Sequence, residues 1–326
     1  MYSPSRPSIS RFLRIRTHNY HIREWGQAKR GVPSLVMVHG WMDVAASFQF
    51  VVDALEHTSL AGRHIISPDW RGCGLTHHVS NPSKSCMGED TDNYWLPDYM
   101  ADLDFLIDHI LRDARPDAQR DAQPDSQVDL LGHSLGGNVV MSYAGARAER
   151  IRRLVNLEGF GMPETKASQA PTRYAQWFDQ LKQFHNGEMA MRAYPALSGV
   201  ASRLMKTNPR LSQDKADWLA QHWSAPNANG EHQILGDPAH KIVNANISRS
   251  EETLALYQRI SMPLLAIEAS DDSMTGWYKG RYTLADYHER LKQVPNARIE
   301  RIENAGHMLH HDQPEKLATL LAGFLA

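Results

Sequence analysis

Short apolar runs alternate with longer amphipathic segments along most of the chain. The runs at 34–40 (SLVMVHG) and 64–70 (HIISPDW) end in glycine or polar residues, and ASFQFVVDAL between them has helical spacing. Two more runs, at 128–134 and 152–160, enclose a second helical segment. Continuous apolar strands separated by helices are typical of a parallel sheet that is buried on both faces. The pattern therefore predicts an α/β fold with a mostly parallel sheet.

The alternation is interrupted once. Between about 162 and 250, segments rich in aromatic residues and histidine (RYAQWFDQLKQF, DWLAQHW) are broken by NPR, SAPNANG and GDPAH, without strand alternation. Strand and helix patterns then return as PLLAIEA, LADYHERLKQV, ARIERIEN and PEKLATLLAGFL. We predict a core built from residues 1–161 and 251–326, with a helical cap inserted at 162–250.

Two segments lie outside this rhythm. Residues 12–26 have the pattern of two strands joined by a polar turn. Residues 115–127 (RPDAQRDAQPDSQ) repeat DAQ and PD without apolar content, which predicts a solvated connection.

Composition excludes several classes of protein. The 326 residues carry 35 basic and 37 acidic side chains, and the basic residues are scattered, which argues against a nucleic-acid partner. Cys73 and Cys86 form no CxxC pair, so a disulfide framework is excluded. The chain has no signal-peptide pattern and no run of 18 apolar residues, so we expect no membrane segment and a cytoplasmic setting.

The first candidate for chemistry is GHSLG at 132–136, which follows an apolar strand and precedes a helix. A serine at a sharp strand-to-helix turn needs small neighbours, and Gly132 and Gly136 provide them. A serine hydroxyl becomes a nucleophile only when a base removes its proton, so Ser134 requires a histidine with an acid behind it. The Leu135 N–H, at the helix start, is placed to stabilise an oxyanion.

With this motif, the VMVHGWMDVAASF, DWRGCGLT and AGHMLHHDQP segments make the chain resemble the α/β-hydrolase fold family over almost its whole length. Among its members, the chain looks most like the serine-hydrolase-like esterases with an HGW loop. The resemblance implies that His307 is the catalytic base and that the Trp41 N–H is the second oxyanion donor. His39 is expected to brace its loop, and Asp69 and Arg71 to form an ion pair that fixes a turn.

Two regions compete to supply the acid. Counting from Pro263 places Asp272 where the family's usual acid falls, with Asp271 one residue early. Glu158, at the end of the preceding strand, is the alternative, because some family members carry their acid there. Ala269 stands where the family's glycine normally lies, which leaves both choices open.

The stretch AGHMLHHDQP, at 305–314, places three histidines within five positions. His307 and His311 share a helical spacing that would suit zinc, but no HExxH occurs among the 17 histidines, and a zinc-bound His307 could not act as a base. We therefore expect no metal, with His310, His311 and Asp312 on the loop surface or capping the last helix. The chain also has no GxGxxG and no GKS or GKT, so no cofactor is expected.

These features predict a serine hydrolase that cleaves a carboxylic ester of a small apolar substrate through an acyl-Ser134 intermediate. Alternatives are hydrolysis of a lactone, a thioester or a C–C bond, and a slow-turnover ligand sensor with the same fold. Epoxide hydrolases and haloalkane dehalogenases use an aspartate nucleophile, which disfavours them. In the cap, we expect four aromatic residues to line the substrate cavity: Trp177, Phe178, Trp218 and Trp223. We expect three histidines of the cap to lie on the polar surface: His185, His222 and His240.

Overall fold

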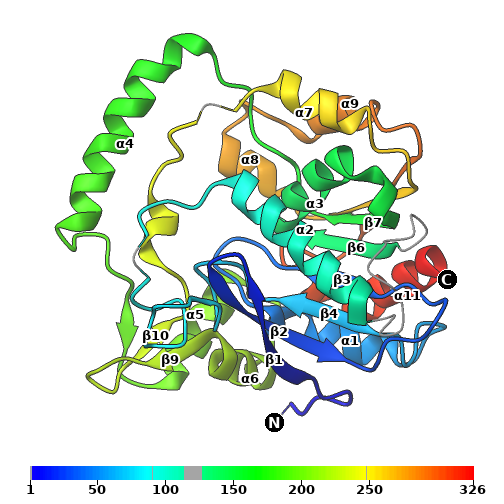
Figure 1. The fold of residues 1–326 in the computed structure, drawn as a ribbon, viewed down its shortest axis with the longest axis horizontal. Helices are drawn as coiled ribbons and strands as arrows, with labels where there is room; N and C mark the ends of the chain where they lie inside the picture. Colours follow the sequence, from blue (N-terminus) through cyan, green and yellow to red (C-terminus); the bar gives the residue numbers. More distant parts are fainter. Residues whose placement is uncertain (1, 90, 114–126, 247) are drawn as a thin grey trace.

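The computed structural model describes residues 2–89, 91–113, 127–246 and 248–326 (Figure 1). A large sheet has the order β1-β2-β4-β3-β6-β7-β11-β12, and β5 pairs with β2. The strands from β4 to β12 are parallel, while β1 and β2 are antiparallel to their neighbours. Their bounds are Ile9–Ile15 (β1), His18–Trp25 (β2), Leu35–Val38 (β3), Ile65–Pro68 (β4), His77–His78 (β5), Val128–His133 (β6), Ile151–Leu157 (β7), Leu264–Ala269 (β11) and Ala297–Ile302 (β12).

Helices cover both faces of this sheet, which confirms the predicted α/β architecture. Gln49–Leu55 (α1) and Pro314–Leu325 (α11) pack on one face, together with the short η1 (Ala45–Phe48) and α10 (Leu309–Asp312). Residues of the other face's helices form a second cluster of buried side chains with the strands. Those helices are Leu96–Asp113 (α2), Leu135–Ala146 (α3), Ser250–Tyr257 (α7), Ser273–Tyr278 (α8) and Leu284–Leu291 (α9), and η2 (Ala148–Arg150) precedes β7.

The segment between β7 and α7 contains more than helices. Its helices are Ala170–His185 (α4), Leu197–Thr207 (α5) and Gln213–Trp223 (α6), with η3 (Ala167–Gln169) and η4 (Pro238–Lys241). Three strands, Ala193–Tyr194 (β8), Ser224–Pro226 (β9) and His232–Ile234 (β10), form a small antiparallel sheet. The segment predicted as a helical cap therefore contains strands as well as helices. Strands of two or three residues are too short to produce a visible alternation of apolar and polar positions.

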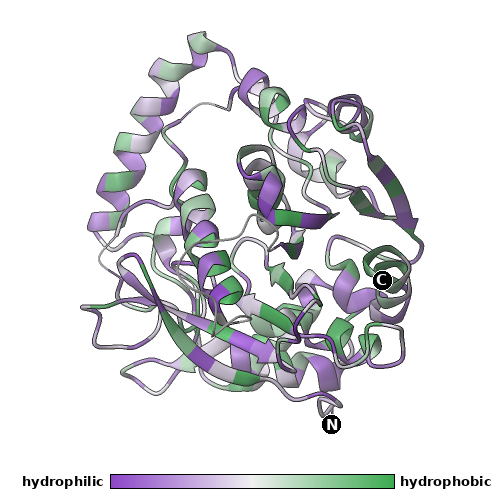
Figure 2. Cartoon of the chain, turned by 45° about the vertical axis from the view of Figure 1, so that its right-hand side comes forward, coloured by the Kyte–Doolittle hydropathy of each residue, from purple (hydrophilic) through white to green (hydrophobic). Residues whose placement is uncertain are grey.

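The helices of this segment differ in how they are packed. α5 and α6 bury Val200, Leu204 and Leu219 in a separate apolar cluster that includes Phe50 of α1. α4 buries none of its residues and stands apart from the sheet (Figure 1). Hydrophobic and hydrophilic residues alternate along it (Figure 2).

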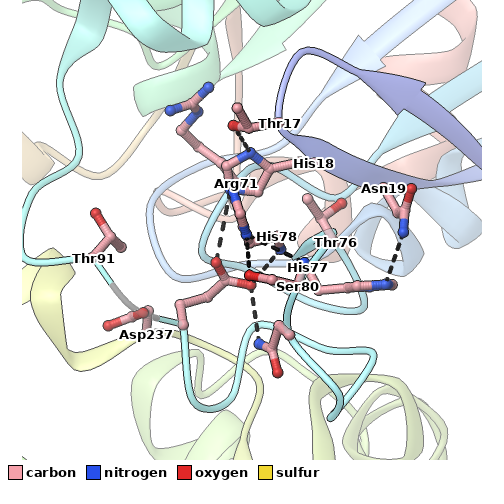
Figure 3. A network of polar contacts seen from close by, with 12 residues as sticks. Thr17, His18, Asn19, Arg71, Thr76, His77, His78, Ser80, Thr91 and Asp237 are labelled. Atoms are coloured by element: carbon pink, nitrogen blue, oxygen red, sulfur yellow. Dashed lines mark hydrogen bonds and ion pairs between the residues drawn. The ribbon is translucent and has the colours of Figure 1, made fainter.

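The loop after β4 is fixed by polar contacts that differ from the expected one. Asp69 and Arg71 do not pair with each other: the Asp69 carboxylate lies 2.7 Å from His21 Nδ1, and Arg71 Nε and Nη2 donate to Asp102 at 2.6 and 2.8 Å. Farther along, the Glu89 carboxylate accepts the His78 N–H at 2.7 Å and the Asn81 amide N–H at 3.2 Å. Figure 3 shows His78 among the polar side chains of this region. The expected turn-fixing role of Asp69 is kept, because its Oδ2 accepts the Leu75 N–H at 2.9 Å.

The predicted strands at 12–26 are confirmed as the hairpin β1–β2. The predicted connection at 115–127 lies, except for Gln127, outside the described residues. Among the described residues, no helix combines the length and the apolar character needed to cross a bilayer.

Candidate active site

Ser134 occupies a strained turn between β6 and α3. Its φ of 54° and ψ of −116° fall in a region that side-chain-bearing residues rarely adopt, and such strain is often concentrated at functional sites. The neighbours leave no room for larger residues: a Cβ on Gly132 would lie 2.3 Å from the Gly136 carbonyl oxygen, and one on Gly136 would lie 2.4 Å from the Val38 carbonyl oxygen. The Ser134 N–H donates to the Leu157 carbonyl at 2.8 Å, which fixes the turn to β7.

His307 lies beside this turn, on the loop that follows β12. The ring of His133, the residue before Ser134, is 4.7 Å from the His307 ring, and His133 Nε2 donates to the His307 carbonyl at 2.8 Å. The Trp277 ring meets the other side of His307 edge-on at 4.4 Å. Burial lowers the pKa of His307 to about 4, so the imidazole is neutral at physiological pH and available as a base.

Glu158 is the carboxylate that contacts His307. Its Oε2 lies 3.3 Å from His307 Nδ1, and its side chain is only 1% exposed. Glu158 has a φ of 55°, an unusual backbone conformation for a residue with a side chain, at the turn that follows β7. The Ala269 N–H donates to Oε1 at 2.7 Å, which orients the carboxylate. Burial raises the pKa of Glu158 to about 8, and the nearby carboxylates of Asp272 and Asp271 raise it further.

Asp272, placed first among the acids from the sequence, lies elsewhere. It is exposed and caps α8: Oδ1 accepts the Thr275 N–H at 3.0 Å, and Oδ2 accepts the Thr275 hydroxyl at 2.5 Å. Asp271 is also exposed and pairs with Arg210 at 2.8 Å. The structure therefore corrects the order of the candidates. β7 and β11 are adjacent parallel strands, so both turns reach the same edge of the sheet, but only Glu158 is turned toward His307.

The residues expected to donate to an oxyanion, Leu135 and Trp41, belong to segments that lie close to Ser134. Leu135 is the first residue of α3, so its N–H has no partner four residues earlier within the helix. The loop after β3 approaches from the other side, because a Cβ on Gly40 would lie 3.1 Å from the Ser134 Cβ. Trp41 follows Gly40, and its side chain is 53% exposed, with Nε1 donating to the His240 carbonyl at 3.3 Å. His39 braces this loop as expected, because Nε2 accepts the Trp70 N–H.

His310 and His311 are not on the surface, contrary to expectation. They are 0% and 5% exposed and face Ser47, whose hydroxyl lies 3.3 Å from His310 Nε2 and 2.7 Å from His311 Nε2. Asp312 is half-buried and accepts the Gly306 N–H at 2.8 Å, so it holds the loop that carries His307. Among the described residues, one group has ligand atoms close enough to hold a metal ion, and it consists of Asp43, His133 and His310.

The cap residues are distributed differently from the prediction. Phe178 is 51% exposed on α4, Trp218 packs against Phe50 at 5.9 Å, and Trp223 Nε1 donates to Asp43 at 2.7 Å. Trp218 and Trp223 therefore contact residues of the core, whereas Phe178 is exposed. Trp277 of α8, which carried no sequence signal, contacts His307.

Of the three cap histidines expected on the surface, His185 is exposed. His222 and His240 are half-buried: His222 Nδ1 contacts Arg23 at 2.8 Å, and the His240 ring stacks on Tyr94 at 3.9 Å. Burial lowers the pKa of both rings, to about 4 and about 3 respectively, so the expectation of polar surface is wrong for these two.

Comparison with known proteins agrees with this architecture. The family model of the α/β-hydrolase fold matches residues 33–314, and the chain belongs to this family. A serine hydrolase-like protein of Danio rerio is 24% identical over 306 residues, covering 92% of this chain and 83% of that protein. A cis-3-alkyl-4-alkyloxetan-2-one decarboxylase of Shewanella oneidensis is 25% identical over 323 residues, covering 98% and 89%. Among solved structures, the thioesterase domain from the curacin biosynthetic pathway superposes with a TM-score of 0.75 at 20% identity, covering 97% of this chain and 99% of that one.

Proposed function

We propose that this protein is a serine hydrolase that cleaves an acyl bond, in the first place a carboxylic ester, with Ser134 as nucleophile, His307 as base and Glu158 as the acid that orients the base. The observation that carries the proposal is the contact between His307 Nδ1 and Glu158 Oε2 at 3.3 Å, with His307 packed beside the strained turn of Ser134. The three residues follow one another along the chain in the order Ser134, Glu158, His307, which is the order nucleophile, acid, base of this fold.

The reaction proceeds in two halves. In the first, neutral His307 takes the Ser134 hydroxyl proton while Oγ attacks the substrate carbonyl, and the imidazolium then gives that proton to the leaving alcohol. In the second, His307 takes a proton from water, which attacks the acyl-serine and releases the acid. Glu158 holds the Nδ1–H tautomer, so that Nε2 is the atom that accepts protons.

Backbone N–H groups would stabilise the negative charge that develops on the carbonyl oxygen of the substrate. The N–H groups of Leu135 and Trp41 would bind this oxyanion, and removing one such donor in other hydrolases costs about 10²–10³-fold in kcat. Glu158 supplies the opposite charge when His307 becomes an imidazolium. Because Glu158 is buried, this pairing is less screened by water than it would be on the surface.

The substrate is expected to be small and apolar. Five apolar residues are each 45–53% exposed: Trp41 on the loop beside Ser134, Trp277 against His307, and Met162, Tyr174 and Phe178 on the inserted segment. An acyl chain that binds against such residues would bury apolar surface, which is favourable and requires no rearrangement of the core. Thioesters and lactones present the same carbonyl to Ser134, and the names of the curacin thioesterase and of the oxetanone decarboxylase are consistent with these classes.

Residues 162–250 would act as the cap over this site, and the protein would work in a reducing compartment such as the cytoplasm. Cys73 and Cys86, the two cysteines of the chain, are both buried and unpaired, which fits that setting.

The test is turnover of p-nitrophenyl esters of increasing acyl length by the wild type and by Ser134→Ala. We expect turnover that falls by several orders of magnitude in the variant, with a preference among chain lengths. Tight ligand binding with negligible turnover would instead identify a ligand sensor. Equal activity in both proteins would reject Ser134 as the nucleophile.

A further inference from the structure

Three buried polar residues converge behind the turn of Ser134. Asp43, His133 and His310 each have one potential ligand atom within 4.8 Å of those of the other two, and the three residues are 3%, 2% and 0% exposed. Each also has one buried side-chain atom that makes no hydrogen bond within the described residues: Asp43 Oδ2, His133 Nδ1 and His310 Nδ1. Buried polar atoms are almost always paired, so three unpaired ones on residues this close together indicate a bound group.

The other polar atom of each residue is already engaged. His133 Nε2 donates to the His307 carbonyl at 2.8 Å, so in the neutral ring Nδ1 carries the lone pair. Asp43 Oδ1 accepts the Val44 N–H at 2.8 Å and the Trp223 indole N–H at 2.7 Å. Metal-binding histidines and carboxylates are typically held in this way by a second hydrogen bond.

His310 can present a lone pair as well. The Ser47 hydroxyl contacts Nε2 of both His310 and His311, but it has a single proton to donate. The shorter contact, at 2.7 Å, is to His311. If Ser47 donates its proton to His311 Nε2, the Nε2–H of His310 donates to the Ser47 oxygen. The Nδ1 atom of His310 then carries a lone pair that is available to a ligand.

The buried carboxylate of Asp43 has no cation beside it. None of the ion pairs among the described residues includes Asp43. The nearby His39 is engaged elsewhere, because Nε2 accepts the Trp70 N–H at 2.9 Å and Nδ1 contacts the Gly40 carbonyl at 2.8 Å. An isolated buried charge is costly, so a bound cation would stabilise this arrangement.

We propose that Asp43, His133 and His310 bind one divalent transition-metal ion of the Zn²⁺ type, through Oδ2, Nδ1 and Nδ1, with a fourth position left for water. Two imidazoles and one carboxylate are a ligand set that suits Zn²⁺. Tetrahedral zinc, with bonds of about 2.0–2.1 Å, holds its ligand atoms roughly 3.3 Å apart. The ligands therefore need to close by at most about 1.5 Å from the 4.8 Å limit. A single bridging water would satisfy the same atoms but would bring no charge to Asp43.

The site is directly connected to the proposed catalytic residues. His133 precedes Ser134 in the chain, and its Nε2–H holds the carbonyl of His307. A metal on His133 would stiffen the segment between nucleophile and base, so occupancy should change kcat more than KM. This consequence rests on the proposed function, whereas the binding itself does not.

The test uses the full chain without an affinity tag, stripped with a chelator and titrated with ZnCl₂ by calorimetry and with Co²⁺ by visible absorption. We expect one ion per chain and the intense absorption of a tetrahedral Co²⁺ site. Asp43→Asn keeps the acceptor for Val44 and Trp223, and His310→Gln nearly keeps the volume. Each should weaken Zn²⁺ binding by about 10- to 100-fold or more.

The matched control is His185→Gln, which removes an exposed histidine that lies 3.2 Å from Asp92 and should leave binding unchanged. Circular dichroism of each metal-free variant checks its folding, and if a variant fails to fold, the wild-type stoichiometry and Co²⁺ spectrum decide. No stoichiometric ion, an octahedral Co²⁺ spectrum, or binding unchanged in folded Asp43→Asn and His310→Gln would overturn the proposal. Ser134→Ala should bind the metal normally, so failure of the proposed function would not be mistaken for failure of this one.

Discussion

Replacing Glu158 by glutamine tests whether Glu158 is the acid, because the substitution changes one carboxylate oxygen to an NH₂ group. The substituted side chain has nearly the same shape, and its carbonyl oxygen can still accept the Ala269 N–H that Oε1 accepts at 2.7 Å. The amide nitrogen then faces His307 Nδ1 in place of Oε2. A donor at that position favours the tautomer with its proton on Nε2, which cannot take the Ser134 proton.

The size of the effect follows from the ground-state geometry. The 3.3 Å between Nδ1 and Oε2 is longer than the ~2.7–2.9 Å of a charge-assisted N–H···O⁻ bond, so this contact adds little before the imidazolium forms. Its loss should therefore appear in kcat rather than KM. The equivalent change in a serine protease triad costs about 10⁴-fold in kcat, and we expect about 10³–10⁴-fold, or about 4–5.5 kcal/mol of transition-state stabilisation.

The assay compares steady-state hydrolysis of a p-nitrophenyl ester by wild type, Glu158→Gln and the matched control Asp272→Asn. Asparagine caps helices as well as aspartate does, so the control should keep its stability and its kcat within about twofold. Thermal unfolding shows whether Glu158→Gln remains folded. A folded Glu158→Gln with more than a tenth of wild-type kcat, or a loss of orders of magnitude in Asp272→Asn, would refute the reasoning.

Three further predictions follow from pKa shifts, buried charge and close packing. First, kcat/KM should keep rising with pH above 6.5 toward about 8, because burial raises the pKa of Glu158 to about 8 and a protonated Glu158 cannot accept the His307 Nδ1–H; a pH profile already level at pH 6 would contradict this. Second, Asp129→Asn should lower the free energy of unfolding in urea by about 3–5 kcal/mol, because it leaves Arg63 and Arg152 without their buried partner, whereas Glu289→Gln, in an exposed pair, should cost under ~0.5 kcal/mol. Third, Gly136→Ala should lower both stability and activity, because its Cβ would lie 2.4 Å from the Val38 carbonyl oxygen, and a thermal scan with no loss would contradict the close approach.

Local patterns in the sequence were enough to predict the sheet and the turn of Ser134. The buried strands are continuous apolar runs, and the two glycines of GHSLG are required because an added Cβ would lie 2.3 Å (Gly132) or 2.4 Å (Gly136) from a backbone oxygen. The apolar runs and the GHSLG motif can both be recognised from consecutive residues, so the sheet and the turn could be predicted without knowing the tertiary contacts.

The acid and the histidine cluster depend on contacts that no local pattern reveals. Glu158 and Asp272 both follow parallel strands that end at one edge of the sheet, and the choice between them is made by the φ of 55° at Glu158 and its hydrogen bond from Ala269. His310 is buried because it meets Ser47, 263 positions earlier in the chain. Trp277 reaches His307 through the placement of α8, which has no sequence signature.

Covalent trapping shows directly whether Ser134 is the nucleophile. Wild type and Ser134→Ala are incubated with a fluorophosphonate, and intact-mass and peptide mass spectrometry locate the adduct. The account predicts one adduct per chain, on Ser134, absent in the variant and slowed severely in Glu158→Gln. No adduct on folded wild type, or an adduct that persists in Ser134→Ala, would contradict it.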